Sequence, residues 1–168
     1  MKKLLLGCLV LCLSISAYAK QCAVPANKID IGSVKLHQNW QSFKQVHPTG
    51  RLLGDTIDMF DTDYAFAREG VMGVGFIDFD ISKNRIIGFT LNYNDGKYAD
   101  YDTPIETFKN SILKHSSFPK TGWVLSKDKQ TYSYHCDDYK LFIKQDYGAG
   151  KGSLGAVVWV FSRYSDSF

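Results

Sequence analysis

Residues 72–93 read MGVGFIDFDISKNRIIGFTLNY, and this stretch decides the fold. Apolar residues occupy alternate positions in both of its arms: Ile77, Phe79 and Ile81 in the first, and Ile87, Phe89, Leu91 and Tyr93 in the second. A period of two, with one apolar and one polar side, predicts antiparallel strands that are buried on one face. The short polar link at 82–84 joins the strands as a hairpin. We place this hairpin in the middle of a sheet that other elements cover on one side.

Two helices are predicted on either side of the hairpin in the sequence. The first begins after Gly32, with Ser33 as its N-cap, and its buried stripe contains Leu36, Trp40, Phe43 and His47. The second has Thr103 as N-cap, Pro104 at the first helical position and Glu106 completing a capping box. It ends near His115.

Further strands are predicted where apolar and polar residues alternate or where a short apolar run lies between turn residues. These are residues 57–68, 123–126, 130–136, 139–147 and 154–161, while residues 51–56 are predicted to form a loop. The last strand, LGAVVWVF, is apolar on both faces, which is typical of a strand that is covered on both sides or lies in the centre of a sheet. The predicted fold is therefore α+β, an antiparallel sheet of about six strands with two helices packed on one face.

The order of elements suggests an internal repeat. A helix followed by three strands occurs once in residues 28–96 and again in residues 97–168, and RIIGFTLNY in the first half resembles GAVVWVFSRY in the second. Coincidence in a helix-plus-sheet protein is the alternative to a duplicated αβββ unit. In element order and length the chain resembles the tandem αβ repeats of the β-lactamase inhibitor protein family. That resemblance implies joined sheets that form a concave protein-binding face, and it carries over no functional residue.

The N-terminal residues 1–19 have the three parts of a secretory signal peptide. Lys2 and Lys3 form the charged part, residues 4–13 form an apolar run, and Ala17-Tyr18-Ala19 is a small-x-small cleavage site. The apolar run is shorter than the roughly 20 residues that a membrane span needs. Cleavage after Ala19 would leave residues 20–168 as one domain, without an integral membrane segment, in the periplasm or outside the cell.

Export changes what the cysteines can do. Of the four cysteines, Cys8 and Cys12 belong to the signal, so Cys22 and Cys136 remain. Two cysteines in an oxidising compartment are expected to pair, and the alternative is a reactive free thiol at each position. Without Lys2 and Lys3 the chain has 18 basic and 17 acidic residues, a charge of +1. This balance gives no electrostatic reason to expect a nucleic-acid partner.

Two short motifs resemble ligand sites and fail on specific residues. Residues 78–84 have calcium-ligand types at alternate positions, but Lys83 stands where an EF-hand loop needs glycine and Phe89 where it needs glutamate. Residues 148–153, GAGKGS, lack the first glycine of a phosphate-binding loop, and Gly152 stands where serine or threonine must follow the lysine. We interpret both as turns, and no metal or cofactor is implied.

Scattered carboxylates and histidines leave an enzyme open as an alternative. Asp61 and Asp63 fall on one face of a predicted strand, so an acid/base pair is geometrically allowed, while a solvated strand edge is the simpler reading. Asp55 and Asp58 lie nearby. The histidines, which are His37, His47, His115 and His135, lack zinc spacing. A serine–histidine–aspartate arrangement is spatial and is not decided by sequence.

Tyrosines in predicted loops carry the functional hypothesis. The chain has 10 Tyr, and Tyr98, Tyr101 and Tyr147 lie between Asp and Gly residues beside strand ends. Such tyrosines are typical of recognition surfaces, and packing onto the sheet edge is the alternative. We therefore expect an exported, non-enzymatic domain, inhibitor-like or immunity-like, that binds another exported or envelope protein through an open sheet face and these loops. The alternatives are a cell-envelope accessory factor and a small secreted hydrolase.

Overall fold

The computed structural model describes residues 20–47, 51–53, 58–61, 74, 76–93, 103–146 and 155–168. Within them, one antiparallel sheet has eight strands in the order β3-β4-β5-β6-β10-β9-β8-β7. The strands, in that order, are Arg51–Leu53, Asp58–Asp61, Phe76–Ser82, Arg85–Tyr93, Gly155–Ser162, Tyr139–Asp146, Thr131–His135 and Val124–Leu125. Six of these strands have four or more residues, so the predicted α+β class and the sheet of about six strands are confirmed. The predicted loop at 51–56 is wrong in part, because β3 occupies its first half.

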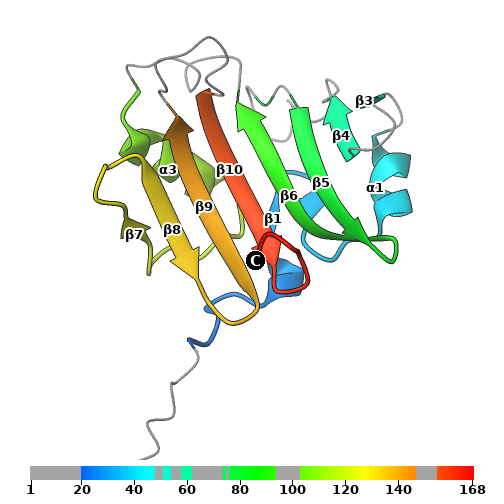
Figure 1. The fold of residues 1–168 in the computed structure, drawn as a ribbon, viewed down its shortest axis with the longest axis horizontal. Helices are drawn as coiled ribbons and strands as arrows, with labels where there is room; N and C mark the ends of the chain where they lie inside the picture. Colours follow the sequence, from blue (N-terminus) through cyan, green and yellow to red (C-terminus); the bar gives the residue numbers. More distant parts are fainter. Residues whose placement is uncertain are drawn as a thin grey trace, which may run out of the picture.

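Both α-helices among the described residues lie behind the sheet in Figure 1. They are α1, Trp40–Val46, and α3, Ile105–Lys114. A short 3₁₀ turn, η1 (Ala26–Lys28), and a two-stranded hairpin of β1 (Asp30–Ile31) and β2 (Val34–Lys35) lie between the N-terminus and α1. The face of the sheet turned toward the viewer carries no helix from the described part of the chain.

The strand order divides the sheet into two meanders. The first runs β3-β4-β5-β6 and the second β7-β8-β9-β10, and the last strands of the two, β6 and β10, pair antiparallel in the centre. Each meander follows one helix, α1 or α3. The two halves thus have the same order of elements, a helix followed by four strands rather than the predicted three. In the sheet, the strands of one half do not alternate with those of the other. The likeness of RIIGFTLNY to GAVVWVFSRY does not extend to the surroundings of their final tyrosines, because Tyr93 is the buried last residue of β6 and Tyr164 is exposed beyond β10.

The central hairpin forms as predicted, with one irregularity that the alternation hides. Lys83 and Asn84 make the two-residue turn, both with positive φ (48° and 60°), which is the geometry of a type I′ turn that follows the twist of the strands. The pairing register shifts at Asp80/Ile81, so that Ile81 faces Ile86. Ile86 belongs to the main core cluster. Ile87 is buried as predicted, at 8% exposed, but it lies outside that cluster and lines a surface hollow with Tyr164. The bulge adds a residue to β6 here, which the strict alternation of the sequence does not account for.

The first helix begins later than predicted. Gly32 and Ser33 form the tight turn between β1 and β2, with Gly32 at φ 58°, and the helix is capped by Asn39, whose side chain accepts from the Ser42 N–H. Ser33 is therefore not the N-cap. The buried stripe is confirmed nonetheless: Trp40 and Phe43 pack on Phe79 of β5 with ring centroids 5.0 and 4.9 Å away.

The second helix covers the other meander. Phe108 is fully buried, and its ring meets Tyr93 edge-on at 5.1 Å. Pro104 occupies the N-cap position. The N-cap therefore lies one residue after the predicted Thr103, so that Glu106 is the second helical residue and does not stand at the capping-box position. The Glu106 carboxylate accepts from Lys109 Nζ at 2.7 Å and from the Tyr132 hydroxyl. Glu106 thereby links the helix to β8.

The N-terminal segment is fastened to the second meander. Cys22 and Cys136 form the disulfide that the sequence predicts. Beside it, the Ala23 N–H donates to the Tyr134 hydroxyl at 3.0 Å, and the Tyr139 hydroxyl donates to the Val24 carbonyl at 2.9 Å. These three links hold residues 22–24 against the lower end of β8 and β9 (Figure 1).

Candidate functional site

The candidate site is the helix-free side of the sheet, which we call the open face. Its residues follow from the pairing register and alternate with the core residues along each strand. They are Asp78 and Asp80 of β5, Thr90 and Asn92 of β6, Val157, Trp159 and Phe161 of β10, Lys140, Phe142 and Lys144 of β9, and Ser133 and His135 of β8. The predicted polar positions Thr90, Asn92, Lys140 and Lys144 all belong to it.

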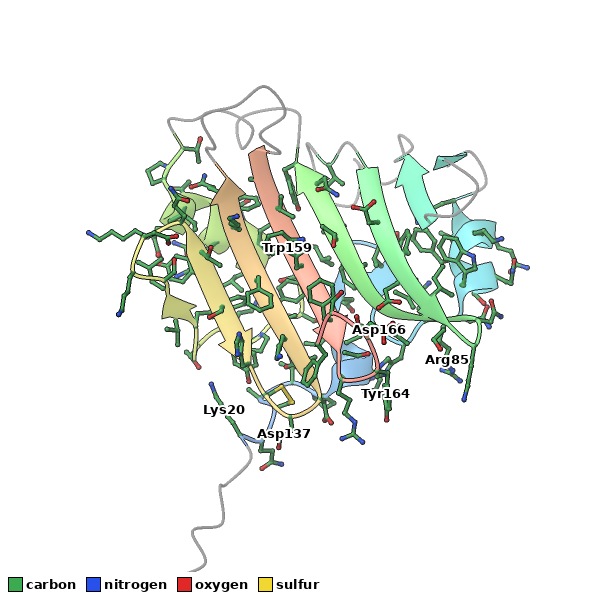
Figure 2. All side chains as sticks on the ribbon, in the orientation of Figure 1. Lys20, Arg85, Asp137, Trp159, Tyr164 and Asp166 are labelled. Carbon is green, nitrogen blue, oxygen red and sulfur yellow. A yellow bond between two sulfur atoms is a disulfide. The ribbon has the colours of Figure 1, made fainter. Side chains whose placement is uncertain are left out.

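Aromatic side chains occupy the centre of the open face. Trp159 pairs across the strands with Phe142, and their rings meet edge-on at 6.3 Å. His135 meets the other side of Phe142 at 5.2 Å, so three rings extend from β10 to β8. Trp159 and Phe142 are each only partly buried, and Figure 2 shows Trp159 on the side facing the viewer. This is a partly exposed aromatic surface in the middle of a sheet.

Glycine makes room for a further ring on this face. Phe161 lies opposite Gly88 in the register, and a Cβ at residue 88 would stand 3.1 Å from Phe161 Cδ1 and 3.2 Å from the Val160 carbonyl. The absence of a side chain at Gly88 lets the Phe161 ring lie close to β6.

Basic side chains border the aromatic residues on one side. Lys144 Nζ lies 5.8 Å from the centre of the Trp159 ring, and Lys140 Nζ lies 4.3 Å from that of Phe168 at the C-terminus. Cation–π contacts of this kind hold an ammonium group over an aromatic ring. Burial, followed by the charges of Lys140 and Lys20, lowers the pKa of His135 below its usual value. The positive charge on this side of the open face comes from the lysines.

Acidic and amide side chains form the other half of the open face. Asn92 is buried, and its Nδ2 donates to Asp78 Oδ2 at 3.0 Å. Burial raises the pKa of Asp78 above its usual value, and the hydrogen bond from Asn92 opposes this in part. With Asp80 on the same strand, the first meander contributes acids to the face and the second contributes lysines and aromatic rings.

The three predicted binding tyrosines, Tyr98, Tyr101 and Tyr147, lie outside the described residues. The residues that flank them can be placed. Tyr93 at the end of β6 pairs with Ala156, and Asp146 at the end of β9 pairs with Gly155. The C-terminal ends of β6 and β9, which precede the two tyrosine-bearing segments in the sequence, therefore lie at the same end of the sheet.

The candidate catalytic residues are not gathered on the open face. Asp55 and Asp63 lie outside the described residues, Asp58 and Asp61 are the ends of β4, and the four histidines are dispersed. One contact is of interest: Ser33 Oγ lies 2.5 Å from Nε2 of the buried His47. Asp30, Ser33 and His115 also line a surface hollow of about 410 Å³. Among the described residues, no group of three or more His, Cys, Asp or Glu side chains is placed to hold a metal ion.

Sequence reasoning missed the aromatic centre of the open face. The signal was present, because the strand at 154–161 is apolar on both sides and one of those sides faces away from the helices. We read this pattern as a strand that is covered on both sides or lies inside the sheet. The second reading is correct for β10, but Trp159 and Phe161 on its second apolar side are only partly buried.

Comparison with protein-family models, curated proteins and solved structures finds no match to this chain. No helix in the described part of the chain is long and apolar enough to cross a membrane.

Proposed function

We propose that this protein is an exported protein-binding domain, inhibitor-like or immunity-like, whose open face docks another exported or envelope protein. The observation that carries the proposal is the partly exposed aromatic group of Trp159 and Phe142 in the centre of a helix-free sheet face. Aromatic residues near the centre of a surface contribute most of the binding energy in many protein complexes.

The surroundings of these rings are those of an interface. Lys140 and Lys144 border them on one side, and Asp78 and Asp80 lie on the other. Charged residues around an aromatic centre select the partner and its orientation more than they add affinity. The partner expected here carries an apolar projection for the centre, with acidic groups toward β9 and basic groups toward β5.

Export is supported by two features. Residues 1–19 have the pattern of a cleaved signal peptide, and a disulfide such as Cys22–Cys136 is typical of proteins outside the cytosol. The resemblance to tandem αβ repeats adds a reason to expect a binding role, since in that family the joined sheets form the binding face.

The test is capture of the partner from the envelope and culture fluid of the source cell with the oxidised mature chain, residues 20–168, as bait. Trp159→Ala and Lys144→Glu are expected to lose the captured protein, with a cost of about 2 kcal/mol or more for the tryptophan. Lys114→Glu, at the exposed end of α3 on the helix side, is the matched charge reversal and should leave capture unchanged. Circular dichroism of each variant checks that it is folded.

The tyrosine-bearing segments are tested with the same bait. Tyr98→Ala, Tyr101→Ala and Tyr147→Ala are expected to weaken the complex if these residues extend the open face. A complex that is lost in the tyrosine variants and unaffected by Trp159→Ala would move the docking surface from the sheet face to the segments at its end. A complex unaffected by all of these changes contradicts the proposal.

A further inference from the structure

Two hollows lie side by side at the lower edge of the sheet, away from the aromatic centre of the open face. One, of about 450 Å³, is lined by His37, Ser82, Lys83, Arg85, Ile87 and Tyr164. The other, of about 310 Å³, also has His37 and Tyr164 in its wall, together with Asp138 and Arg163. Figure 2 shows Tyr164 and Arg85 projecting at this edge. We propose that the larger hollow is a binding site for a carboxylate that is joined to a planar apolar group.

The apolar part of the site comes from the bulge in β6 and from the C-terminal turn. The register shift at Asp80/Ile81 leaves Ile87 without a paired residue on β5, and Ile87, although only 8% exposed, forms part of the wall of the hollow. Tyr164 is 62% exposed, and its ring is held by the His37 ring, whose centre is 5.8 Å away, and by the Arg163 guanidinium at 5.3 Å. An exposed ring and an aliphatic side chain in the wall of one hollow suit a flat apolar group, which gains stacking and burial together.

The charged part of the site comes from the turn of the central hairpin. Lys83 and Arg85 both line the hollow, and no acidic residue is among its described lining residues. Arg85 Nη1 donates to the His37 carbonyl at 3.1 Å, which holds the guanidinium at the rim. A guanidinium has five N–H donors, so the remaining donors are enough for a two-pronged bond to a carboxylate.

His37 shows the features of a residue held in place for a ligand. It has a positive φ of 66°, an uncommon backbone conformation for residues other than glycine, although histidine adopts it more readily than most. The geometry is maintained because its N–H donates to the Ile86 carbonyl at 2.7 Å. Its Nε2 is buried and has no hydrogen-bond partner among the described residues. Buried polar atoms without a partner and residues at positive φ are both found more often at ligand sites than elsewhere.

The smaller hollow, of about 310 Å³, which shares His37 and Tyr164 with the first, does not offer cationic groups without an acidic partner. Its acid, Asp138, pairs with its Arg163 at 3.3 Å, so the two charges satisfy each other. The anion-binding capacity is therefore confined to the side of Lys83 and Arg85. The inference does not depend on whether the open face binds a protein.

The test is an NMR titration of the oxidised mature chain with two acids, phenylacetate as a free small molecule and the peptide Gly-Gly-Phe as a chain end. The control ligand is the peptide's C-terminal amide. Both acids are expected to shift the backbone amides of residues 37, 83–85 and 164, and the amide should bind about tenfold more weakly because it lacks the charge. Tighter binding of the peptide assigns the site to a chain end, and equal or tighter binding of phenylacetate assigns it to a free aromatic acid.

Variants distinguish this site from general attraction to a basic surface. Arg85→Ala and Lys83→Ala should each weaken acid binding by about tenfold, and Tyr164→Ala should also weaken it whereas Tyr164→Phe should not. Lys127→Ala, in the exposed turn between β7 and β8 at the other edge of the sheet, is the control and should have no effect. Absence of saturable binding by either acid, equal binding of the amide, or unchanged binding by Arg85→Ala together with Lys83→Ala would overturn the proposal.

Discussion

Asp78 is a carboxylate on the open face whose ionisation opposes folding. Burial raises its pKa above the usual value, although the amide of Asn92 donates to it at 3.0 Å. The folded chain therefore binds this proton more tightly than the unfolded chain does. It follows that the free energy of unfolding falls as the pH rises from the ordinary aspartate pKa, about 3.9, to the raised pKa of the folded state, and stays level above it.

We expect Asp78→Asn to remove this fall in stability. Urea unfolding of both proteins between about pH 3 and pH 7 should give a difference, variant minus wild type, that becomes more favourable as the pH rises. Asp128 provides a contrast of opposite sign, because hydrogen bonds from Ser126 and the Gln130 N–H lower its pKa. The contribution of Asp128 to the free energy of unfolding therefore increases as the pH rises through its pKa, whereas that of Asp78 decreases. A pH-independent difference for Asp78→Asn would contradict the assignment.

Ser33 is a residue whose role the structure changes from helix cap to partner of a buried histidine. Its hydroxyl lies 2.5 Å from Nε2 of His47, which is 1% exposed. Ser33→Ala removes this partner, and we expect the free energy of unfolding to fall by about 1–3 kcal/mol. Ser42→Ala, on the exposed side of α1, should change it by less than about 0.5 kcal/mol.

The same variant tests the hydrolase alternative. A nucleophilic Ser33 requires that Ser33→Ala abolish turnover of any ester or peptide that the wild-type protein cleaves, while a purely structural Ser33 requires only the loss of stability. A survey of small chromogenic esters with both proteins separates the two, and cleavage that survives in Ser33→Ala excludes this serine as the nucleophile.

Among the elements, the turn between β5 and β6 sets the register of the central hairpin. Lys83 and Asn84 have φ values of 48° and 60°, and asparagine tolerates this region better than most residues do. The carbonyl of Asn84 also accepts from the Trp40 N–H at 3.0 Å, so the turn positions the start of α1.

Asn84→Val is expected to destabilise the protein by about 1–2 kcal/mol, because a β-branched residue is strained at positive φ. Asn84→Gly should have little effect, since glycine adopts this conformation freely and keeps the same backbone carbonyl. Urea unfolding measures both. Equal losses in the two variants would show that the Asn84 side chain, and not the backbone conformation, is what the turn needs.

The elements that could be predicted are those whose burial is periodic. The alternation in residues 76–93 identified β5 and β6, and the spacing of Phe108, Ile112 and Leu113 identified α3. The start of α1 was placed too early because Leu36 has helical spacing to Trp40, yet it follows the β1–β2 hairpin and is buried there. The bulge at Ile87 could not be predicted, because Ile86 and Ile87 are both apolar and the alternation is compatible with either of them on the core face of the sheet.

At the scale of the whole molecule, the candidate sites depend on contacts between distant parts of the chain. The aromatic centre joins β8, β9 and β10, and the hollow beside Arg85 joins the central hairpin, the segment before α1 and the C-terminal turn. The periodicity of the sequence predicts on which face of the sheet a residue lies, but it does not predict which strands are neighbours in that sheet. The strand order that pairs β6 with β10 was therefore not available from the sequence, although the likeness of the two halves pointed toward it.

The disulfide links two distant parts of the chain. It joins Cys22 and Cys136, which are 114 residues apart, and so closes a loop that contains α1, α3 and six strands of the main sheet. In the chain-entropy model such a bridge stabilises the folded state by about 4 kcal/mol, because it restricts the unfolded chain. We expect a reducing agent to lower the free energy of unfolding of the wild-type protein by about this amount, and to have no effect on Cys22→Ser/Cys136→Ser.

The bridge should matter for stability and not for the shape of the open face. Hydrogen bonds to Tyr134 and Tyr139 hold the N-terminal segment at the same place, and the aromatic centre lies on strands whose pairing does not involve residues 20–24. Reduced protein at a temperature well below its unfolding transition should therefore capture the same partner as oxidised protein. Loss of capture in the reduced but folded state would show instead that the bridge positions part of the docking surface, and would move the proposed site toward the lower end of β8 and β9.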